Sequence, residues 1–339
     1  MVTRFEECDS FRRMRRLTKP GCRWKHRIRA GVALPLLLAA LGACGEAQDG
    51  PAIPDLAPDR PSADGAAVLA LVDTQLAFGP RVPGTAGHEA QLLWMTDRLR
   101  AAADTLVIQA FDHVHTQTGE QLPLTNVLAR FRLEADRRLL FLAHWDTRPT
   151  SDAEDTPEDR VLPLPGANDG GSGTAVLLHV AELLAASPPD VGVDLLWVDG
   201  EDYGPTTADM FIGARHYASN RPDPQPEYGV LLDMVGDADP RFPVEGYSSQ
   251  LAPDVVDRVW GVAHALGLES TFPFQVGQRI SDDHLPLNNA GLPTANIIDF
   301  DYGPDNAYWH TQEDVLDKLS AGTLESVAEV VLELIYGGG

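Results

Sequence analysis

The chain has 339 residues, of which 44% are hydrophobic and 22% are charged. This composition is too apolar for a disordered chain and is enough to bury a sizeable core. From Cys44 onward the chain carries 16 basic and 47 acidic residues, which argues against a partner that presents a phosphate backbone, such as a nucleic acid.

The amino terminus predicts an export signal. A basic stretch, 12–29, precedes the apolar run 30–43, which is shorter than the ~20 residues needed to span a bilayer. The run ends in Leu41-Gly42-Ala43-Cys44, similar to the box at which bacterial lipoproteins are cleaved and acylated. We therefore expect residues 1–43 to be a lipoprotein-type signal peptide. The exported protein would be anchored in a membrane of the bacterial cell envelope through a lipid on Cys44. The alternative is an ordinary signal peptide that ends near a cysteine.

The segment that follows the signal is rich in Pro, Ala and Asp. We interpret residues 44–65 as a tether and residues 66–339 as a single domain. The other two cysteines, Cys8 and Cys22, lie in the part that would be removed, so the remaining chain has no disulfide available.

Short apolar strands alternate with amphipathic helices throughout this domain. The patterns predict helices at 66–78, 87–103, 174–186, 208–219, 253–266 and 321–336. They predict strands at 105–114, 126–132, 139–144, 193–198, 230–234 and 294–298. Continuously apolar strands separated by helices indicate an α/β fold with a mostly parallel sheet that is covered on both faces.

Polar residues follow three of the apolar strands directly. They are His144 and Asp146 after the first, Asp199, Glu201 and Asp202 after the second, and Asp233 at the end of the third. Because ligands of open α/β sheets bind beyond the carboxyl ends of the strands, we expect these side chains to converge on one crevice. For any one of these acids alone, a helix cap or an exposed loop residue is the favoured explanation, and it is their occurrence at three strand ends that indicates a functional site.

Two further clusters carry polar groups. Asp169 lies in the glycine-rich segment 166–173, and His310 follows Trp309 after the last strand. Imidazole and carboxylate together suit zinc, which acts as a Lewis acid when one of its positions stays open. The glycines also suggest a phosphate loop, but the Walker Lys-Ser/Thr pair is missing. No Gly-x-Ser-x-Gly elbow supports a serine hydrolase.

The order of these clusters resembles the zinc aminopeptidase and glutaminyl cyclase superfamily over residues 66–336. The motifs are His144-x-Asp146, Asn168-Asp169-Gly-Gly-Ser-Gly, Asp199-Gly-Glu201-Asp202, Asp233-Met-Val-Gly and Trp309-His310-Thr311. The resemblance implies a three-layer α/β/α sandwich with a mostly parallel, mixed sheet.

The resemblance also implies the roles of the site residues. Asp169, Asp202 and His310 would hold one zinc, and Glu201 would be the general acid/base. His144 and Asp233 match the positions that hold a second zinc in the aminopeptidases, with Asp169 bridging the two ions. Asp146 would orient His144.

Three features resemble the bacterial glutaminyl cyclases in particular: Gly213-Ala214-Arg215-His216, Ile280-Ser281-Asp282-Asp283-His284-Leu285-Pro286, and Trp309 beside His310. They imply that Asp233 and Asp282 assist Glu201 and that Trp309 forms a wall of the substrate site. Ordinary core packing is the alternative for Trp309, as is a buried structural role for His284. The chain departs from the animal cyclases at Asp202, where they have Glu, and after Tyr203, where their Leu-His-Trp segment is missing.

The resemblance thus implies an enzyme that acts on peptides with a free amino terminus. A cyclase would convert amino-terminal glutamine to pyroglutamate with one zinc. A dizinc aminopeptidase, which releases amino-terminal residues, is the alternative. A non-catalytic lipoprotein that uses the same crevice is a third.

Overall fold

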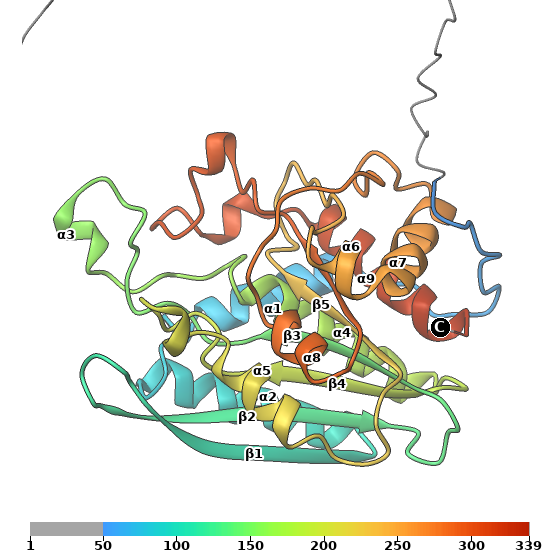
Figure 1. Cartoon of the computed structure of the whole chain (residues 1–339), viewed down its shortest axis with the longest axis horizontal. Coiled ribbons are helices and arrows are strands. Elements are labelled where there is room, and N and C mark those ends of the chain that lie inside the picture. Colours follow the sequence, from blue (N-terminus) through green and yellow to red (C-terminus); the bar gives the residue numbers. More distant parts are fainter. Residues whose placement is uncertain (1–49, 339) are drawn as a thin grey trace, which may run out of the picture. The chain divides into compact units, whose positions relative to one another are not determined.

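Six strands form one sheet in the order β1-β2-β4-β3-β5-β6 (Figure 1). The computed structural model describes residues 50–338. The strands are β1 (Thr105–Val114), β2 (Gln121–Phe131), β3 (Arg138–His144), β4 (Gly192–Val198), β5 (Tyr228–Asp233) and β6 (Thr294–Ile298). Strands β4, β3, β5 and β6 are parallel, whereas β1 pairs with β2 and β2 with β4 in antiparallel register. The prediction of a mostly parallel, mixed sheet is confirmed.

Helices cover both faces of this sheet, so the predicted three-layer sandwich is also confirmed. One face packs against α1 (Gly65–Leu76), α2 (Ala86–Ala102), α4 (Gly171–Ala186), α7 (Pro253–Ala265) and α9 (Ala321–Tyr336). The other face packs against α5 (Ile212–Ser219) and α8 (His284–Asn289). The remaining short elements are α3 (Pro157–Arg160), α6 (Ser248–Leu251) and the 3₁₀ turns Thr207–Asp209, Pro304–Asn306 and Leu316–Lys318.

The central strand β3 shows why a continuously apolar run is needed here. All seven of its residues are buried. Phe141 and Ala143 face the core under α4, whereas Leu140 and Leu142 face the core under α5 and α8. A strand that is buried on both faces cannot alternate polar with apolar residues. Its first polar side chains therefore lie where the strand ends.

Two helices differ from the sequence-based expectation. The predicted helix 208–219 is interrupted at Phe211, which has a φ of 54°, so α5 begins only after it. Helix α4 begins at Gly171, three residues earlier than predicted. A Cβ on Gly173 would lie 2.2 Å from the carbonyl oxygen of Leu232, so glycine allows the first turn of α4 to pack directly on β5.

The predicted signal peptide, residues 1–43, and Cys44 lie outside the described residues, so export and lipid anchoring stay predictions. Among residues 50–338, no helix is both long enough and apolar enough to cross a membrane.

Part of the predicted tether, residues 50–64, is in contact with α9. Arg60 pairs with Glu329 and Glu333, and its Nε lies 2.5 Å from Glu333 Oε2. The other oxygen of Glu333 accepts a hydrogen bond of 2.7 Å from the backbone N–H of Ala57. These glutamates lie four residues apart and so share one helix face, which fastens the segment along the helix.

Candidate active site

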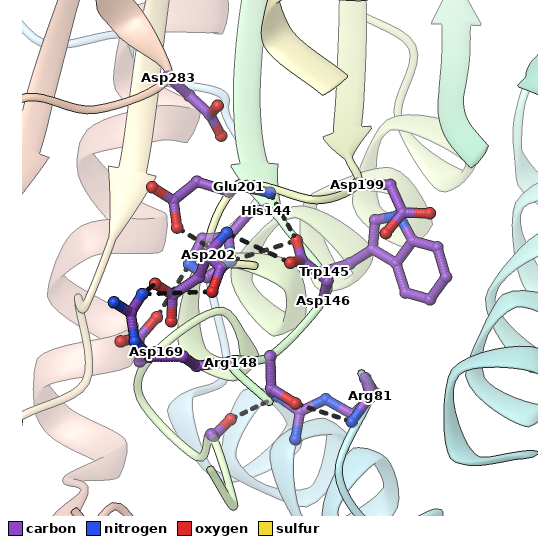
Figure 2. A network of polar contacts seen from close by, with 12 residues as sticks. Arg81, His144, Trp145, Asp146, Arg148, Asp169, Asp199, Glu201, Asp202 and Asp283 are labelled. Atoms are coloured by element: carbon purple, nitrogen blue, oxygen red, sulfur yellow. Dashed lines mark hydrogen bonds and ion pairs between the residues drawn. The ribbon is translucent and has the colours of Figure 1, made fainter. Parts of the chain in front are cut away.

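The polar residues at the strand ends, with the exception of Asp199, meet at one place, as the sequence predicts (Figure 2). His144 ends β3, Asp233 ends β5, and Glu201 and Asp202 follow β4 after a turn at Gly200. Asp169 lies in the turn before α4, and His310 lies in the loop between β6 and α9. Each of these residues is buried.

Five of the residues form two groups that share Asp169, and each group could hold a metal ion. The groups are Asp169, Asp202 and His310, and His144, Asp169 and Asp233. In the first, His310 Nε2 lies 3.6 Å from Asp169 Oδ2 and 3.7 Å from Asp202 Oδ2. In the second, His144 Nε2 lies 3.2 Å from both Asp169 Oδ1 and Asp233 Oδ1.

The chemistry of these side chains fits a divalent cation. Asp202 Oδ2 is buried and accepts no hydrogen bond. Burial raises the pKa of Asp202 to about 7, and the charge of Asp169 adds to this effect while that of His310 opposes it. Burial makes this carboxylate costly to ionise, and its unpartnered oxygen faces an imidazole. Both properties are expected of a carboxylate that binds zinc. The donors, imidazole nitrogen and carboxylate oxygen, are those that zinc binds.

A second set of residues, which the sequence did not reveal, supports these ligands from outside. Asp152 Oδ1 lies 2.8 Å from His310 Nδ1, so the nitrogen facing Asp169 and Asp202 is left free to bind a metal. Arg148 pairs with Asp202 and, at 3.1 Å, with Asp152. The loop after β3 thereby holds two candidate metal ligands, Asp202 after β4 and His310 between β6 and α9.

Two buried carboxylates hold the backbone of the ligand loops. The oxygens of Asp146 accept hydrogen bonds from the N–H groups of Glu201 (3.1 Å) and Asp202 (3.3 Å). The carboxylate oxygens of Asp314 accept hydrogen bonds from the backbone N–H groups of Asn168 (2.8 Å) and Asp169 (3.2 Å). Asp146 was expected to orient His144, but it lies 3.7 Å from His144 Nδ1, and its hydrogen bonds go to the loop after β4.

One glycine is required at the centre of the site. Gly170 has a φ of 58°, and a Cβ there would lie 2.9 Å from the ring of His144 and 2.8 Å from the carbonyl oxygen of Asp146. Neighbouring residues are also in the left-handed region: φ is 47° at Met234 and 54° at His310. Backbone strain of this kind concentrates at functional sites, where the surrounding structure enforces it.

A pocket opens beside the first group of ligands. Its polar lining includes Glu201, Asp233 and Asp282. Burial raises the pKa of Glu201 well above its ordinary value. Burial also raises the pKa of Asp282 to about 7, with a further contribution from the charge of Asp233. Carboxyl groups whose pKa is raised in this way are suited to general acid/base catalysis.

Asp233 and Asp282, which the resemblance implies as partners of Glu201, line the same pocket as that residue. Across residues 50–338, their side chains share the pocket without a hydrogen bond from one to another. Asp282 instead accepts hydrogen bonds from Asn296 Nδ2 (2.6 Å) and from the backbone N–H of Asp283 (2.5 Å).

Asp283 is a further acid that the sequence analysis did not assign to the site. Its side chain points towards Glu201 (Figure 2), and its two buried carboxyl oxygens accept no hydrogen bond. It precedes α8 but does not cap that helix, so a capping role does not explain it.

The rest of the pocket wall is apolar. Trp309 stacks on His310 with ring centroids 3.8 Å apart and lies 5.3 Å from the ring of Phe300. Ile280, Ile298 and Met210 complete this wall. The site therefore presents an acid/base group, a candidate metal group and an apolar surface to the same small space.

Asp199 does not join the other strand-end residues. It lies beside Trp145, away from the ligands (Figure 2), and both of its oxygens are 3.0 Å from His88 Nε2. It also accepts a hydrogen bond of 2.6 Å from the N–H of Thr125. Asp199 therefore links the end of β4 to α2 and β2.

Comparison with known proteins agrees with this geometry. The model of peptidase family M28 matches residues 126–335. A Zn-dependent exopeptidase from Parabacteroides distasonis superposes with a TM-score of 0.79 at 34% identity, covering 82% of this chain and 99% of that one. A glutaminyl cyclase from Bacteroides thetaiotaomicron, solved with N-acetylhistamine, gives the same score and identity and covers 83% of this chain and 100% of that one. The aminopeptidase YwaD of Bacillus subtilis is 28% identical over 207 residues, which are 57% of this chain but only 39% of YwaD.

Proposed function

We propose that this chain, which belongs to peptidase family M28, is a zinc-dependent glutaminyl-peptide cyclotransferase. It would convert the amino-terminal glutamine of peptides to pyroglutamate and release ammonia. The observation that carries this proposal is the pocket in which Glu201 and Asp282 lie next to Trp309, beside the ligand group of Asp169, Asp202 and His310. Similarity to the Bacteroides cyclase over that protein's whole length supports it.

Asp169, Asp202 and His310 would hold the zinc. When bound, it would polarise the side-chain amide carbonyl of the glutamine and stabilise negative charge on its oxygen. The apolar surface of Trp309 and Phe300 would pack against the methylene groups of the glutamine and exclude water.

Glu201 would carry the proton. The α-amino nitrogen of the substrate forms a bond to the side-chain amide carbon, and the bond from that carbon to the amide nitrogen breaks. The Glu201 carboxylate accepts a proton from the attacking amine and returns it to the departing nitrogen, which leaves as ammonia. Burial keeps the pKa of Glu201 high, and the charges of Asp202 and Asp282 add to this effect. Asp233, which lines the same pocket, would assist Glu201 there.

A dizinc aminopeptidase is the second candidate, and the group of His144, Asp169 and Asp233 favours it. These residues would hold a second zinc, and Glu201 would take a proton from the water that attacks the first peptide bond. Similarity to the Zn-dependent exopeptidase and to YwaD supports this reading. One zinc per chain favours the cyclase, and two favour the peptidase.

Mass spectrometry of the products separates the two. The zinc-loaded protein is incubated with a peptide that begins with Gln and with a matched peptide that begins with Leu. A cyclase removes ammonia from the first and leaves the second unchanged, whereas release of an amino acid from either peptide would overturn the proposal. The Glu201→Gln variant should retain zinc and lose turnover by roughly 10²–10⁴-fold.

We also propose that the protein is exported and anchored through a lipid on Cys44. The sequence ahead of Cys44 supports this. The Cys44→Ala variant, expressed in a bacterial host, should move from the membrane fraction to the soluble fraction. An unchanged membrane fraction would count against the anchor.

A further inference from the structure

The segment between Glu201 and α5 forms a closed loop next to the pocket. The N–H of Phe211 donates a hydrogen bond of 2.9 Å to the carbonyl oxygen of Glu201, and that of Ile212 donates one of 3.0 Å to Gly200. These two bonds close the base of a compact surface loop, residues 202–210. Met210, at its end, lines the pocket that also contains Glu201.

One arginine holds the outer part of this loop. Arg215 Nη1 donates to the carbonyl oxygen of Thr207 (3.1 Å), and Nη2 donates to those of Ala208 (3.0 Å) and Met210. Arg215 belongs to the Gly-Ala-Arg-His segment that the proposed chemistry leaves without a role. Its planar guanidinium can bind several carbonyl groups at once, which a lysine cannot reproduce.

The other side of the loop is fastened to the hairpin of β1 and β2. Asp209 is fully buried, and its Oδ1 lies 2.8 Å from His113 Nε2 and 2.9 Å from the N–H of Thr116. Its Oδ2 accepts a hydrogen bond of 2.5 Å from the hydroxyl of Thr116. With both sides held, Met210 has little freedom to move away from the pocket.

We propose that Arg215 is a positioning residue that fixes Met210 in the pocket wall, and that Met210 selects the peptide residue next to the amino-terminal one. Met210 is the apolar side chain that the loop contributes to the pocket wall, which it shares with Ile280, Phe300 and Trp309. A thioether adapts to apolar side chains of different shape, so we expect a preference for bulky apolar residues at the second position. This inference rests on the proposed action at the peptide amino terminus.

The test measures kcat and KM for Gln-Phe and Gln-Gly peptides. The Arg215→Met variant keeps the length of the side chain and loses its donors. We expect KM for Gln-Phe to rise roughly tenfold with kcat changed less than about twofold, because ground-state and transition-state binding are lost together. Arg215→Lys should recover part of the loss.

Arg221 provides the matched control. It donates a hydrogen bond of 3.0 Å to the carbonyl oxygen of Ala290, away from the pocket lining. Arg221→Met should leave both constants unchanged. Equal effects of the Arg215 and Arg221 variants, or an Arg215 effect carried by kcat alone, would overturn the positioning role.

The Met210→Ala variant tests selectivity without disturbing the loop contacts. It should lower the preference for Gln-Phe over Gln-Gly by roughly tenfold, the scale expected for a few methylene groups in an apolar pocket. An unchanged preference would overturn the role of Met210. A failure of the proposed cyclase activity is distinguishable from a failure of this inference. If the enzyme were a peptidase, the product would be a released amino acid, and the rates for the two peptides could still be compared.

Discussion

Replacing Asp152 tests how the site holds its metal ligand His310. The carboxylate lies 2.8 Å from His310 Nδ1 and also pairs with Arg148. Burial alone would raise the pKa of Asp152, but the hydrogen bond to His310 and the charge of Arg148 hold it well below its ordinary value. The residue therefore stays anionic at neutral pH and keeps the proton of His310 on Nδ1.

Partners of this kind typically contribute 10–100-fold to metal affinity, or about 1.4–2.8 kcal/mol. The side chain of Asp152 is 46% exposed, and an asparagine retains an oxygen that can accept the hydrogen bond. We therefore expect Asp152→Asn to weaken zinc binding about tenfold, at the lower end of that range, and Asp152→Ala to approach a hundredfold.

Competition with a chelator measures both affinities. Glu154→Gln is the control, since Glu154 lies in the same loop and accepts a hydrogen bond from the N–H of Gln312 rather than from a ligand. Wild-type affinity in both Asp152 variants would refute the assignment of His310 as a ligand oriented by Asp152.

Three further substitutions test how the fold is stabilised. Gly170→Ala should lower stability by more than the ~1–2 kcal/mol expected for a left-handed alanine, because the new Cβ meets His144 and the carbonyl oxygen of Asp146, and it should weaken zinc binding by shifting the adjacent Asp169. Gly79→Ala, with a φ of 80° and open space around it, measures the backbone cost alone in the same denaturant titration. Arg60→Met should lower the free energy of unfolding by about 1–3 kcal/mol, because it leaves a buried glutamate of α9 without its charged partner; no change in the denaturation midpoint would contradict this. Burial raises the pKa of Asp299 from 3.8 to about 7, so the folded state keeps this proton longer and stability should fall as pH rises from about 4 to about 7. Asp299→Asn should remove up to about 4 kcal/mol of this dependence, and thermal melts at pH 4 and pH 8 that shift equally in both proteins would exclude it.

The sequence predicted the site best where the polar residues are attached to buried strands. A short apolar run such as 139–143 favours a strand inside the sheet, and parallel strands end at the same edge, so the pattern predicts that His144, Glu201 and Asp233 converge. Asp169 and His310 are placed by loops, and only the resemblance to known motifs identified them.

The supporting residues could not be predicted in this way. Asp152 and His310 are 158 positions apart, and Asp152 lies in a loop whose composition is that of an ordinary polar surface segment. Nothing in such a loop distinguishes an acid that faces solvent from one that binds a histidine.

Local signals also failed where tertiary contacts override them. The predicted helix is interrupted at Phe211 because its N–H donates a hydrogen bond to Glu201 and closes a loop. The helical periodicity of the sequence does not indicate this contact. The Pro/Ala/Asp-rich composition of residues 50–64 suggested a free tether. Its contact with α9 depends on Glu329 and Glu333, about 270 positions further along the chain. The composition of a segment indicates how flexible it is in isolation, but it does not indicate which helix it contacts in the folded protein.

The arrangement of the carboxylates explains why the inner ones are suited to a metal. Asp146 and Asp314, one layer out, each accept hydrogen bonds from two backbone N–H groups, which offset part of the cost of burying them, although burial still raises the pKa of Asp314 to about 7. Asp202 has no such donor at its Oδ2, and its charge is opposed by that of Asp169. Because a buried carboxylate oxygen without a donor favours a proton or a cation, Asp202 Oδ2 is left with an unmet demand for positive charge even though Asp202 Oδ1 pairs with Arg148. A divalent ion between Asp169, Asp202 and His310 meets that demand, and this is the physical reason to expect the metal at these three residues.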